Sequence, residues 1–440
     1  MSHKPPATFR WPKARRLSAA ALLLGLMVGR ADAQLGLPPL HLPVPAPGQL
    51  IDATTQSVQD AEGRLIAPII GARVAAGRAL IRQNRALIEA DPDGEPIVRA
   101  ELLAYGPDAA TLDALAAGGF EIKRRESLGA LGGELITLRA PAGVSTRRAL
   151  ARLRRIDPAG DYDYNHIYLP SGGADASAPP VAADAAAAAP PGRAIVGMID
   201  SGVEASHPAL ARLRTEQGGC EGRLIPASHG TAVASLIAAG TASMPGTAPD
   251  TRLIAIDVYC GEATGGSTER VALAFASLAQ ERVGVINVSL VGPRNAALAR
   301  AVAAVQARGV LVVAAVGNDG PAAPPLYPAA LPGVIAVTGV DERDRVLPEA
   351  GRGAHVAFAA PGAGLRAADL KQRYAVVRGT SYASPIVAGL LAGLLSADTG
   401  PPERALHSLI GAARDLGAPG RDPVYGYGLV GEGVRSAEAP

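Results

Sequence analysis

The sequence predicts an α/β protein whose larger part is a doubly wound, mostly parallel sheet with helices on both faces, preceded by a small α+β domain. Two observations lead to this prediction. From residue 193 onward, short apolar runs rich in β-branched residues alternate with helical stretches, and the runs lack the polar alternation of a half-exposed sheet. Residues 97–169 instead follow the order strand, helix, strand, strand, helix, strand.

The composition is that of an ordinary globular protein. The chain has 440 residues, of which 48% are hydrophobic, so it can hold two or three domains. Its formal net charge is only +2, and its arginines are spread along the chain. We therefore expect no nucleic-acid partner, because such a partner requires a concentrated basic surface.

The first 33 residues differ from everything that follows. Basic residues precede an apolar run at 17–29, which leads into Ala-Asp-Ala at 31–33. This pattern predicts a signal peptide, residues 1–33, cleaved after Ala33, with an uncleaved anchor as the alternative. No later segment is apolar for long enough to form a stable membrane span in the mature chain. We therefore expect an exported protein, periplasmic or extracellular, in an oxidising compartment.

Two segments connect the signal and the domains. Residues 34–96 combine a proline-rich spacer with a helical pattern that runs from 71 to 89, and the sequence assigns this segment no function. Residues 171–192 are rich in alanine and proline and show no periodicity. They predict a linker that is accessible to proteases.

The small α+β domain is predicted at 97–170. Its order of elements indicates a split βαβ unit. Asp108 and Ser145 are the expected N-caps of its two helices, and Gly118 is the expected stop of the first.

The larger domain is predicted at 193–440. Parallel strands in such a sheet place ligands at their carboxyl ends, so function should be sought at that edge. The expected strands are 193–200, 252–259, 284–290, 309–317, 333–340 and 355–362, and the expected helices lie near 230–239, 268–281, 295–307, 381–397 and 402–412.

The chain has two cysteines, Cys220 and Cys260. In an exported protein they favour a disulfide, which would close a loop of about 40 residues and stabilise the fold by roughly 4 kcal/mol. The alternative is two separate thiols. Two cysteines alone are too few for a zinc site.

Four polar residues are expected at the carboxyl edge of the sheet: Asp200, His229, Asn318 and Ser381. Each alone could be a cap or a turn former. Together they match acyl transfer, in which an imidazole activates a serine hydroxyl, a buried carboxylate orients the imidazole, and an amide donor stabilises the oxyanion. The chain order Asp, His, Ser distinguishes this set from α/β-hydrolases and from chymotrypsin-like enzymes.

The segments MIDSGVEASHP, SHGTAVAS, VVAAVGNDGP and GTSYASP resemble the signature segments of subtilisin-like serine proteases, the subtilases, over about residues 193–432. The resemblance implies Asp200 as orienting carboxylate, His229 as general base, Ser381 as nucleophile and Asn318 as oxyanion donor. It implies no cofactor for catalysis, and it leaves structural calcium possible but unassigned. The α+β unit resembles a subtilase propeptide, a folding aid and inhibitor whose last strand leads into the cleft.

The resemblance also implies the substrate-binding positions. A slot for the residue before the cut would lie between two strands, with Leu326 at its floor where many subtilases have a small residue. We therefore expect cleavage after small or medium apolar residues. Alternatively, Leu326 turns into the core, or Asp319 at the rim attracts a basic residue. The strand residues are Ser289, Leu290, Val291 and Gly292 on one side and Ala314, Ala315, Val316 and Gly317 on the other.

Three departures from the family pattern stand out. Val291 occupies a position where glycine is usual, so its side chain could crowd the substrate and alter specificity. Ala232 stands where a second histidine is usual, and Tyr382 where methionine is common. We expect neither Ala232 nor Tyr382 to touch the chemistry directly.

The leading hypothesis is a secreted serine endopeptidase that forms an acyl-enzyme, acts on polypeptide substrates and has its own propeptide-like domain as a partner. Self-processing within residues 171–192 would leave a mature chain that begins near residue 190. The alternative is a catalytically silent subtilase-fold module for binding or scaffolding. An esterase or transferase on another α/β fold is disfavoured, because Ser381 lacks a G-x-S-x-G elbow.

Overall fold

The computed structural model describes residues 71–171, 173–174, 194–211, 214–241, 244–398 and 400–435. The chain divides into two units, Met1–Ser57 and Val58–Pro440, and every described residue belongs to the second. The predicted signal peptide, the spacer before residue 71 and most of the linker at 171–192 lie outside the described residues.

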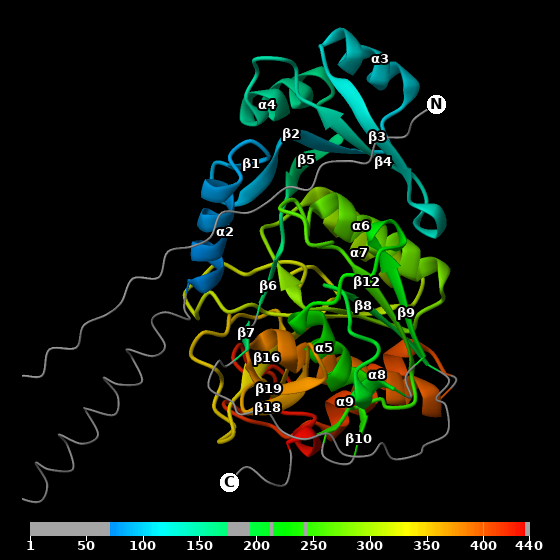
Figure 1. Cartoon of the computed structure of the whole chain (residues 1–440), viewed down its shortest axis with the longest axis vertical. Coiled ribbons are helices and arrows are strands. Elements are labelled where there is room, and N and C mark those ends of the chain that lie inside the picture. Colours follow the sequence, from blue (N-terminus) through cyan, green and yellow to red (C-terminus); the bar gives the residue numbers. More distant parts are fainter. Residues whose placement is uncertain are drawn as a thin grey trace, which may run out of the picture. The chain divides into compact units, whose positions relative to one another are not determined.

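A seven-stranded sheet, parallel throughout, forms the centre of the larger domain (Figure 1). The strand order is β17-β16-β15-β13-β8-β12-β9, so β13, β15, β16 and β17 follow one another outward from β8, whereas on the other side β12 lies between β8 and the edge strand β9. The strands are β8 (Ile195–Asp200), β9 (Arg214–Gly219), β12 (Arg252–Asp257), β13 (Val285–Val288), β15 (Leu311–Ala315), β16 (Ile335–Val340) and β17 (Val356–Pro361).

Helices cover both faces of this sheet. Two adjacent residues of β15 point to opposite faces of the sheet and meet different helices. Val312 packs in the same cluster as α6 and α7, whereas Val313 packs with α5, α8 and α9. Strands buried on both faces need no polar alternation, so the predicted doubly wound architecture is confirmed. The helices are α5 (Ser228–Ala238), α6 (Thr268–Gln280), α7 (Ala296–Gln306), α8 (Thr380–Ala397) and α9 (Pro402–Ala412).

Helix α8 is the most apolar of the long helices. Among the described residues it is the one helix that has the length and composition to cross a membrane. Two thirds of it (67%) are buried inside the protein, where it packs against the sheet and against α5. The structure therefore uses α8 as a core helix.

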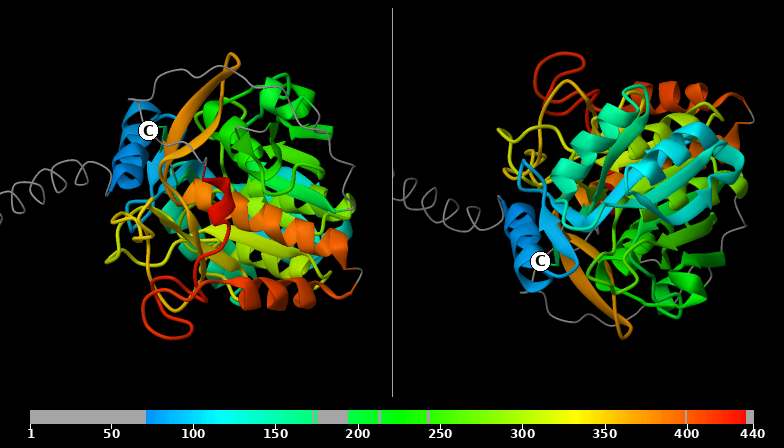
Figure 2. Two further views of the ribbon diagram at one scale, coloured as in Figure 1. Left: turned by 90° about the horizontal axis from the view of Figure 1, so that it is seen from below. Right: turned by 90° about the horizontal axis from the view of Figure 1, so that it is seen from above.

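The smaller domain is an antiparallel sheet with two helices on one face. Its strand order β3-β4-β2-β5 is that of a split βαβ unit, as the sequence predicts. Seen from above, α3 and α4 lie in front of this sheet (Figure 2). The elements are β2 (Pro96–Tyr105), α3 (Ala109–Ala117), β3 (Glu121–Ser127), β4 (Glu134–Arg139), α4 (Thr146–Ile156) and β5 (Asp161–His166).

Both faces of the small sheet are buried. Leu102 and Ile136 pack under α3 and α4, whereas their neighbours Leu103 and Leu135 join the core that contains α6 and α7 of the larger domain. The predicted caps are confirmed, because Asp108 accepts from the Thr111 amide and Ser145 from the Arg148 amide. The small domain therefore sits directly on two helices of the large one.

The predicted helix at 71–89 is too long. Helix α2 (Ala72–Gln83) ends at Asn84, whose backbone amide and side chain both donate to Leu80 O. The segment β1 (Ile88–Ala90) then pairs with β2, so the small sheet begins before residue 97. Ile88 lies at helical spacing from Ile81, but the edge of β2 offers it backbone partners and full burial, and this tertiary pairing outweighs the local pattern.

Candidate active site

The four predicted polar residues all lie at the carboxyl edge of the sheet. Asp200 is the last residue of β8, and Asn318 follows β15 by three positions. His229 and Ser381 are the second residues of α5 and α8, so both lie at helix N-termini. Their positions follow from the parallel topology, because each of these helices begins where the chain reaches that edge.

Asp200 and His229 form a hydrogen-bonded pair. His229 Nδ1 lies 2.8 Å from Asp200 Oδ1, and the Asp200 side chain is 1% exposed. The same carboxylate oxygen accepts from the amide of Ser201 at 2.6 Å. A carboxylate held in this way fixes Nδ1 as the protonated nitrogen, and His229 Nε2, which is buried and has no hydrogen-bond partner, is left as an acceptor.

Ser381 is fully buried in the first turn of α8. Its hydroxyl donates to Ser289 O at 3.0 Å, and its Oγ lies 2.6 Å from the Oγ of Ser171. The neighbouring Ser289 hydroxyl donates in turn to Ser381 O at 2.9 Å. The start of α8 is thus tied to the segment that follows β13.

Asn318 is oriented by the same helix. Its Oδ1 accepts from the backbone amide of Thr380 at 3.2 Å, which turns its Nδ2 toward the cleft. There Nδ2 donates to the carbonyl oxygen of Ser171. The amide therefore lies where a donor can stabilise negative charge on that oxygen.

A segment of the chain itself lies in the cleft as an extended strand. Tyr168 N donates to Gly266 O at 2.8 Å, and the strand β6 (Leu169–Pro170) pairs antiparallel with β14 (Leu290–Val291). Beyond Ser171, β7 (Gly173–Ala174) pairs antiparallel with β19 (Arg373–Arg378). The protein thus binds polypeptide backbone on both sides of the Ser171–Gly172 bond.

A family model for the subtilase family matches residues 192–428, which is more than half of the chain. The chain belongs to the subtilase family. It is 34% identical over 248 residues to subtilisin DY of Bacillus licheniformis, covering 53% of this chain and 88% of that protein. The predicted resemblance to the subtilisin-like serine proteases is thereby confirmed.

Two further comparisons show how much of this chain and of its relatives is similar. The minor extracellular protease Epr of Bacillus subtilis (strain 168) is 34% identical over 206 residues, and the match covers 46% of this chain but only 32% of Epr. The crystal structure of fervidolysin from Fervidobacterium pennivorans, a keratinolytic enzyme related to subtilisin, superposes with a TM-score of 0.65 at 21% identity. That superposition covers 80% of this chain and 62% of fervidolysin, and it supports the fold.

Leu326, the residue that the sequence predicts at the floor of the slot, lies beside Gly317. Its Cδ1 lies 2.5 Å from the position that a Cβ on Gly317 would take, so the side chain packs directly on Gly317. Leu326 is 8% exposed. The residues Ala314, Ala315 and Val316 that precede Gly317 are buried, as are Ser289, Leu290 and Val291 on the opposite strand.

Val291 does not prevent a strand from binding in this subtilase. It lies opposite Leu169 in the register of β14 and β6, so a substrate-like backbone is accommodated beside its side chain. Gly292 is the position that must stay small, because a Cβ there would lie 2.6 Å from the Tyr168 ring. A side chain would therefore crowd the bound strand at position 292, whereas the Val291 side chain does not.

Tyr382 contacts the candidate base, contrary to the prediction. Its ring centroid lies 5.4 Å from that of His229, at an interplanar angle of 47°. Burial first, and the charge of Asp200 second, raise the pKa of Tyr382, so the phenol stays neutral. The sequence could not indicate this contact, because the two residues lie on different helices about 150 positions apart.

Tyr168 anchors the strand that lies in the cleft, and sequence reasoning did not identify it. Its side chain is fully buried, and its hydroxyl donates to Pro293 O at 2.6 Å. Its carbonyl oxygen accepts from the hydroxyl of Tyr259 at 3.2 Å. An aromatic residue three positions before Ser171 thus anchors the strand in the cleft, and only its rarity in a chain with 3% aromatic residues could have drawn attention to it.

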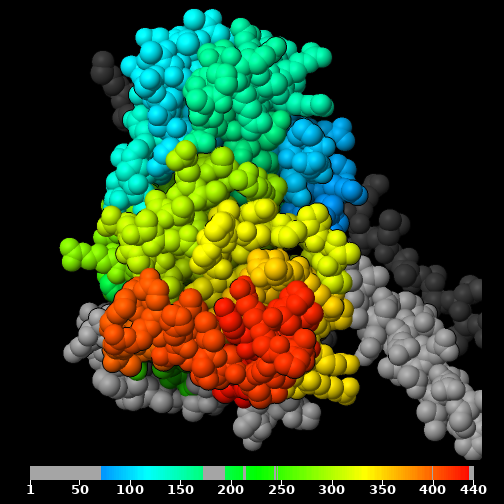
Figure 3. Space-filling model, turned by 180° about the vertical axis from the view of Figure 1, so that it is seen from behind, coloured from blue at the N-terminus to red at the C-terminus, as the bar shows by residue number. Residues whose placement is uncertain are grey.

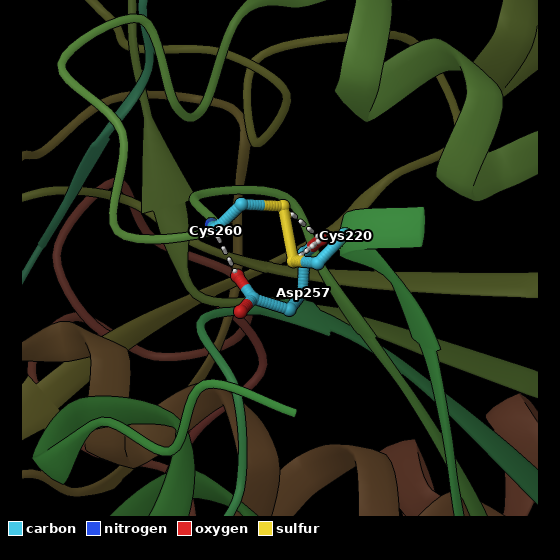
Figure 4. A group of neighbouring side chains, drawn as sticks. All are labelled: Cys220, Asp257 and Cys260. Carbon is cyan, nitrogen blue, oxygen red and sulfur yellow. Dashed lines mark hydrogen bonds between the residues drawn. A yellow bond between two sulfur atoms is a disulfide. The ribbon is translucent and has the colours of Figure 1, made fainter. Parts of the chain in front are cut away.

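The predicted disulfide between Cys220 and Cys260 is present (Figure 4). It joins the short helix after β9 to the loop after β12, where the Asp257 carboxylate accepts from the amides of Tyr259 and Cys260. Among the described residues, the side chains of Cys220, Asp257 and Cys260 are the one group that lies close enough together to hold a metal ion. The disulfide occupies both cysteine sulfurs, so the group does not fit a metal.

Proposed function

We propose that this subtilase is an exported serine endopeptidase in which Ser381 is the nucleophile, His229 the general base, Asp200 the orienting carboxylate and Asn318 the oxyanion donor. As a member of a protease family, it acts on polypeptides. Export is supported by the predicted signal peptide and by relatives such as the extracellular protease Epr.

The proposed reaction begins with attack of Ser381 Oγ on the carbonyl carbon of the bond to be cut. His229 Nε2, the free acceptor, takes the hydroxyl proton, and Asp200 stabilises the imidazolium. Asn318 Nδ2 stabilises the oxyanion. Collapse releases the amine, which receives the proton from His229, and a water then hydrolyses the acyl-enzyme by the same route. Subtilases in general need no catalytic cofactor for these steps.

One change from the described state is required before attack. The Ser381 hydroxyl now donates to Ser289 O, and His229 Nε2 has no partner. We propose that the Ser381 hydroxyl turns to His229 as the substrate carbonyl engages Asn318. Catalytic hydrogen bonds are often looser outside the reacting complex and tighten when it forms.

The observation that carries this proposal is the contact between Asn318 and the Ser171 carbonyl. Together with the pairing of β6 and β7, it supports the Ser171–Gly172 bond as the site of self-processing. This position lies at the start of the predicted linker at 171–192. The first new N-terminus would then be Gly172 rather than a residue near 190.

The small domain would act as the inhibitory propeptide. Its strand β6 fills the cleft, and its sheet packs on α6 and α7 through Leu103, Leu128 and Leu135. A polar contact reinforces this packing, because Arg124 pairs with Glu269 of α6. A domain held both in the cleft and on these helices blocks substrate until it is released.

Mass spectrometry of the full chain tests the proposal. Wild type should yield an N-terminus at Gly172, whereas Ser381→Ala should keep the Ser171–Gly172 bond intact. Ser408→Ala, an exposed serine on α9, should be processed like wild type. Cleavage of this bond in purified Ser381→Ala would contradict self-processing by Ser381.

A further inference from the structure

Helix α2 makes a contact for which no role has been assigned. It precedes the split βαβ unit, and its Arg73 reaches the catalytic domain, where Arg73 Nε donates to Asp319 Oδ2 at 2.7 Å. The remaining guanidinium nitrogens donate to both oxygens of Glu95 at 2.7 and 2.8 Å. In Figure 3, α2 (blue) lies against the yellow surface of the catalytic domain.

We infer that Asp319 forms an arginine-binding subsite beside the oxyanion residue, and that Arg73 occupies it so that α2 latches the prosegment into the cleft. The prosegment here means the described residues 71–171. The inference rests on the proposed function, because it assigns α2 to the control of the proposed inhibitor.

The burial of the three charged groups makes the pairing necessary. The side chains of Arg73 and Asp319 are each only 7% exposed, and that of Glu95 is 19% exposed. Asp319 Oδ1 is buried and has no hydrogen-bond partner. Without Arg73, two carboxylates would face each other with little access to water, which is costly. Burial acts to lower the pKa of Arg73, but the two carboxylates outweigh it, so the guanidinium stays charged.

The location of Asp319 connects α2 to the reaction centre. Asp319 follows Asn318, whose amide holds the Ser171 carbonyl. The next residue, Gly320, donates its amide to Glu349 O at 2.8 Å, and the Glu349 carboxylate pairs with Arg378 of β19. Asp319 therefore lies between the oxyanion residue and a hydrogen-bonded connection to β19, the strand that pairs with β7.

Helix α2 also covers the strand that lies in the cleft. Gly77, one turn after Arg73, is buried, and a Cβ there would lie 3.8 Å from Leu169 Cδ1. Leu80 and Ile81 then join a cluster with Leu169. The middle of the helix therefore contacts β6, and its first turn contacts Asp319 through Arg73.

Such a latch would matter after the Ser171–Gly172 bond is cut. The cut separates the prosegment from the catalytic domain covalently, but α2, β6 and the small sheet remain parts of one prosegment. Release then requires the Arg73–Asp319 pair to break while Asp319 gains water. Truncating one partner of a buried, hydrogen-bonded charge pair acts mainly on the dissociation rate.

The test compares release of the prosegment in full-length variants. Cut complexes are diluted, and release is followed by size-exclusion chromatography and by the onset of peptide hydrolysis. Arg73→Ala should release the prosegment about thirtyfold faster or more. The matched control is Arg78→Ala, an exposed arginine of the same helix, which should behave like wild type. An unchanged release rate in Arg73→Ala would overturn the latch.

A double-mutant cycle identifies the partner. Asp319→Ala alone should also speed release, and Arg73→Ala combined with Asp319→Ala should release no faster than the faster single variant. Fully additive effects would show that Arg73 and Asp319 act independently, and would refute the subsite.

A second measurement does not depend on cutting or on folding yield of the active enzyme. In the uncut Ser381→Ala background, hydrogen exchange of the α2 amides should rise about thirtyfold when Arg73 becomes alanine and stay unchanged for Arg78→Ala. Equal exchange in all three proteins would overturn the latch. If wild type is never cut, the proposed self-processing fails, while this exchange experiment still decides the latch.

Discussion

Leu326 allows a quantitative prediction of specificity. Its side chain packs on Gly317 and is 8% exposed, so we expect it to fill depth that would otherwise be available to the residue before the cut. Ser171, whose carbonyl oxygen accepts from Asn318, is the residue before the proposed cut, and its small side chain agrees with the proposed shallow slot. Leu326→Ala removes three carbon atoms, and a few methylenes of pocket space are worth about 1–3 kcal/mol, or about tenfold to two-hundredfold in discrimination.

The assay uses peptides that differ only at the residue before the cut, and measures kcat/KM for alanine and for phenylalanine. Leu326→Ala should raise the ratio of phenylalanine to alanine by at least about tenfold. Leu331→Ala is the matched control, because Leu331 is a buried leucine of the same loop region that belongs to the α6–α7 core. It should lower the free energy of unfolding without changing the ratio. A folded Leu326→Ala enzyme with the wild-type ratio would refute the shallow slot.

Three further predictions concern the oxyanion, the disulfide and the dependence on pH. Asn318→Ala should lower kcat about a hundredfold to a thousandfold with little change in KM, because the donor acts on the transition state, and an unchanged kcat in steady-state kinetics would contradict its role. Replacing Cys220 and Cys260 together by serine should lower the free energy of unfolding in urea by roughly 4 kcal/mol, and a loss below about 1 kcal/mol would count against the disulfide as a main constraint on the unfolded chain. Burial acts to raise the pKa of Glu101, but the hydrogen bond from Lys123 and the other partners outweigh it, so its pKa is lowered on folding. A lowered pKa contributes stability that is lost as the pH falls below about 4.3, so hydrogen exchange of the small domain should rise in that range, and less steeply in Glu101→Gln. If hydrogen exchange of the small domain depended on pH identically in wild type and Glu101→Gln, Glu101 would be excluded as the source of the pH dependence.

The central sheet and the four candidate catalytic residues were predictable for a physical reason. Strands buried on both faces lack polar alternation, and each catalytic segment carries a short motif at the end of an element. Strand β9, by contrast, was not predicted. Its sequence RTEQGG is polar because the strand lies at the edge of the sheet, where it pairs with β12 on one side.

The features that depend on distant pairing were not predictable. Ile88 keeps helical spacing but joins a strand, and Tyr382 meets His229 from another helix. Ser171 lies at the start of a segment of low complexity, and only the pairing of β6 and β7 on either side of it marks its peptide bond. Sequence patterns record which residues are buried, but they do not record which distant segments bury them.

The most direct test of the account is the labelling of the released enzyme with a fluorophosphonate probe, which forms a phosphorus–oxygen bond to an activated serine and loses fluoride. Peptide mapping by mass spectrometry should find the adduct on Ser381, and His229→Ala should abolish it, because the hydroxyl then has no base. Absence of an adduct on Ser381 in the active wild-type enzyme, or an adduct on another serine that accounts for the loss of activity, would contradict the assignment of Ser381 as the nucleophile.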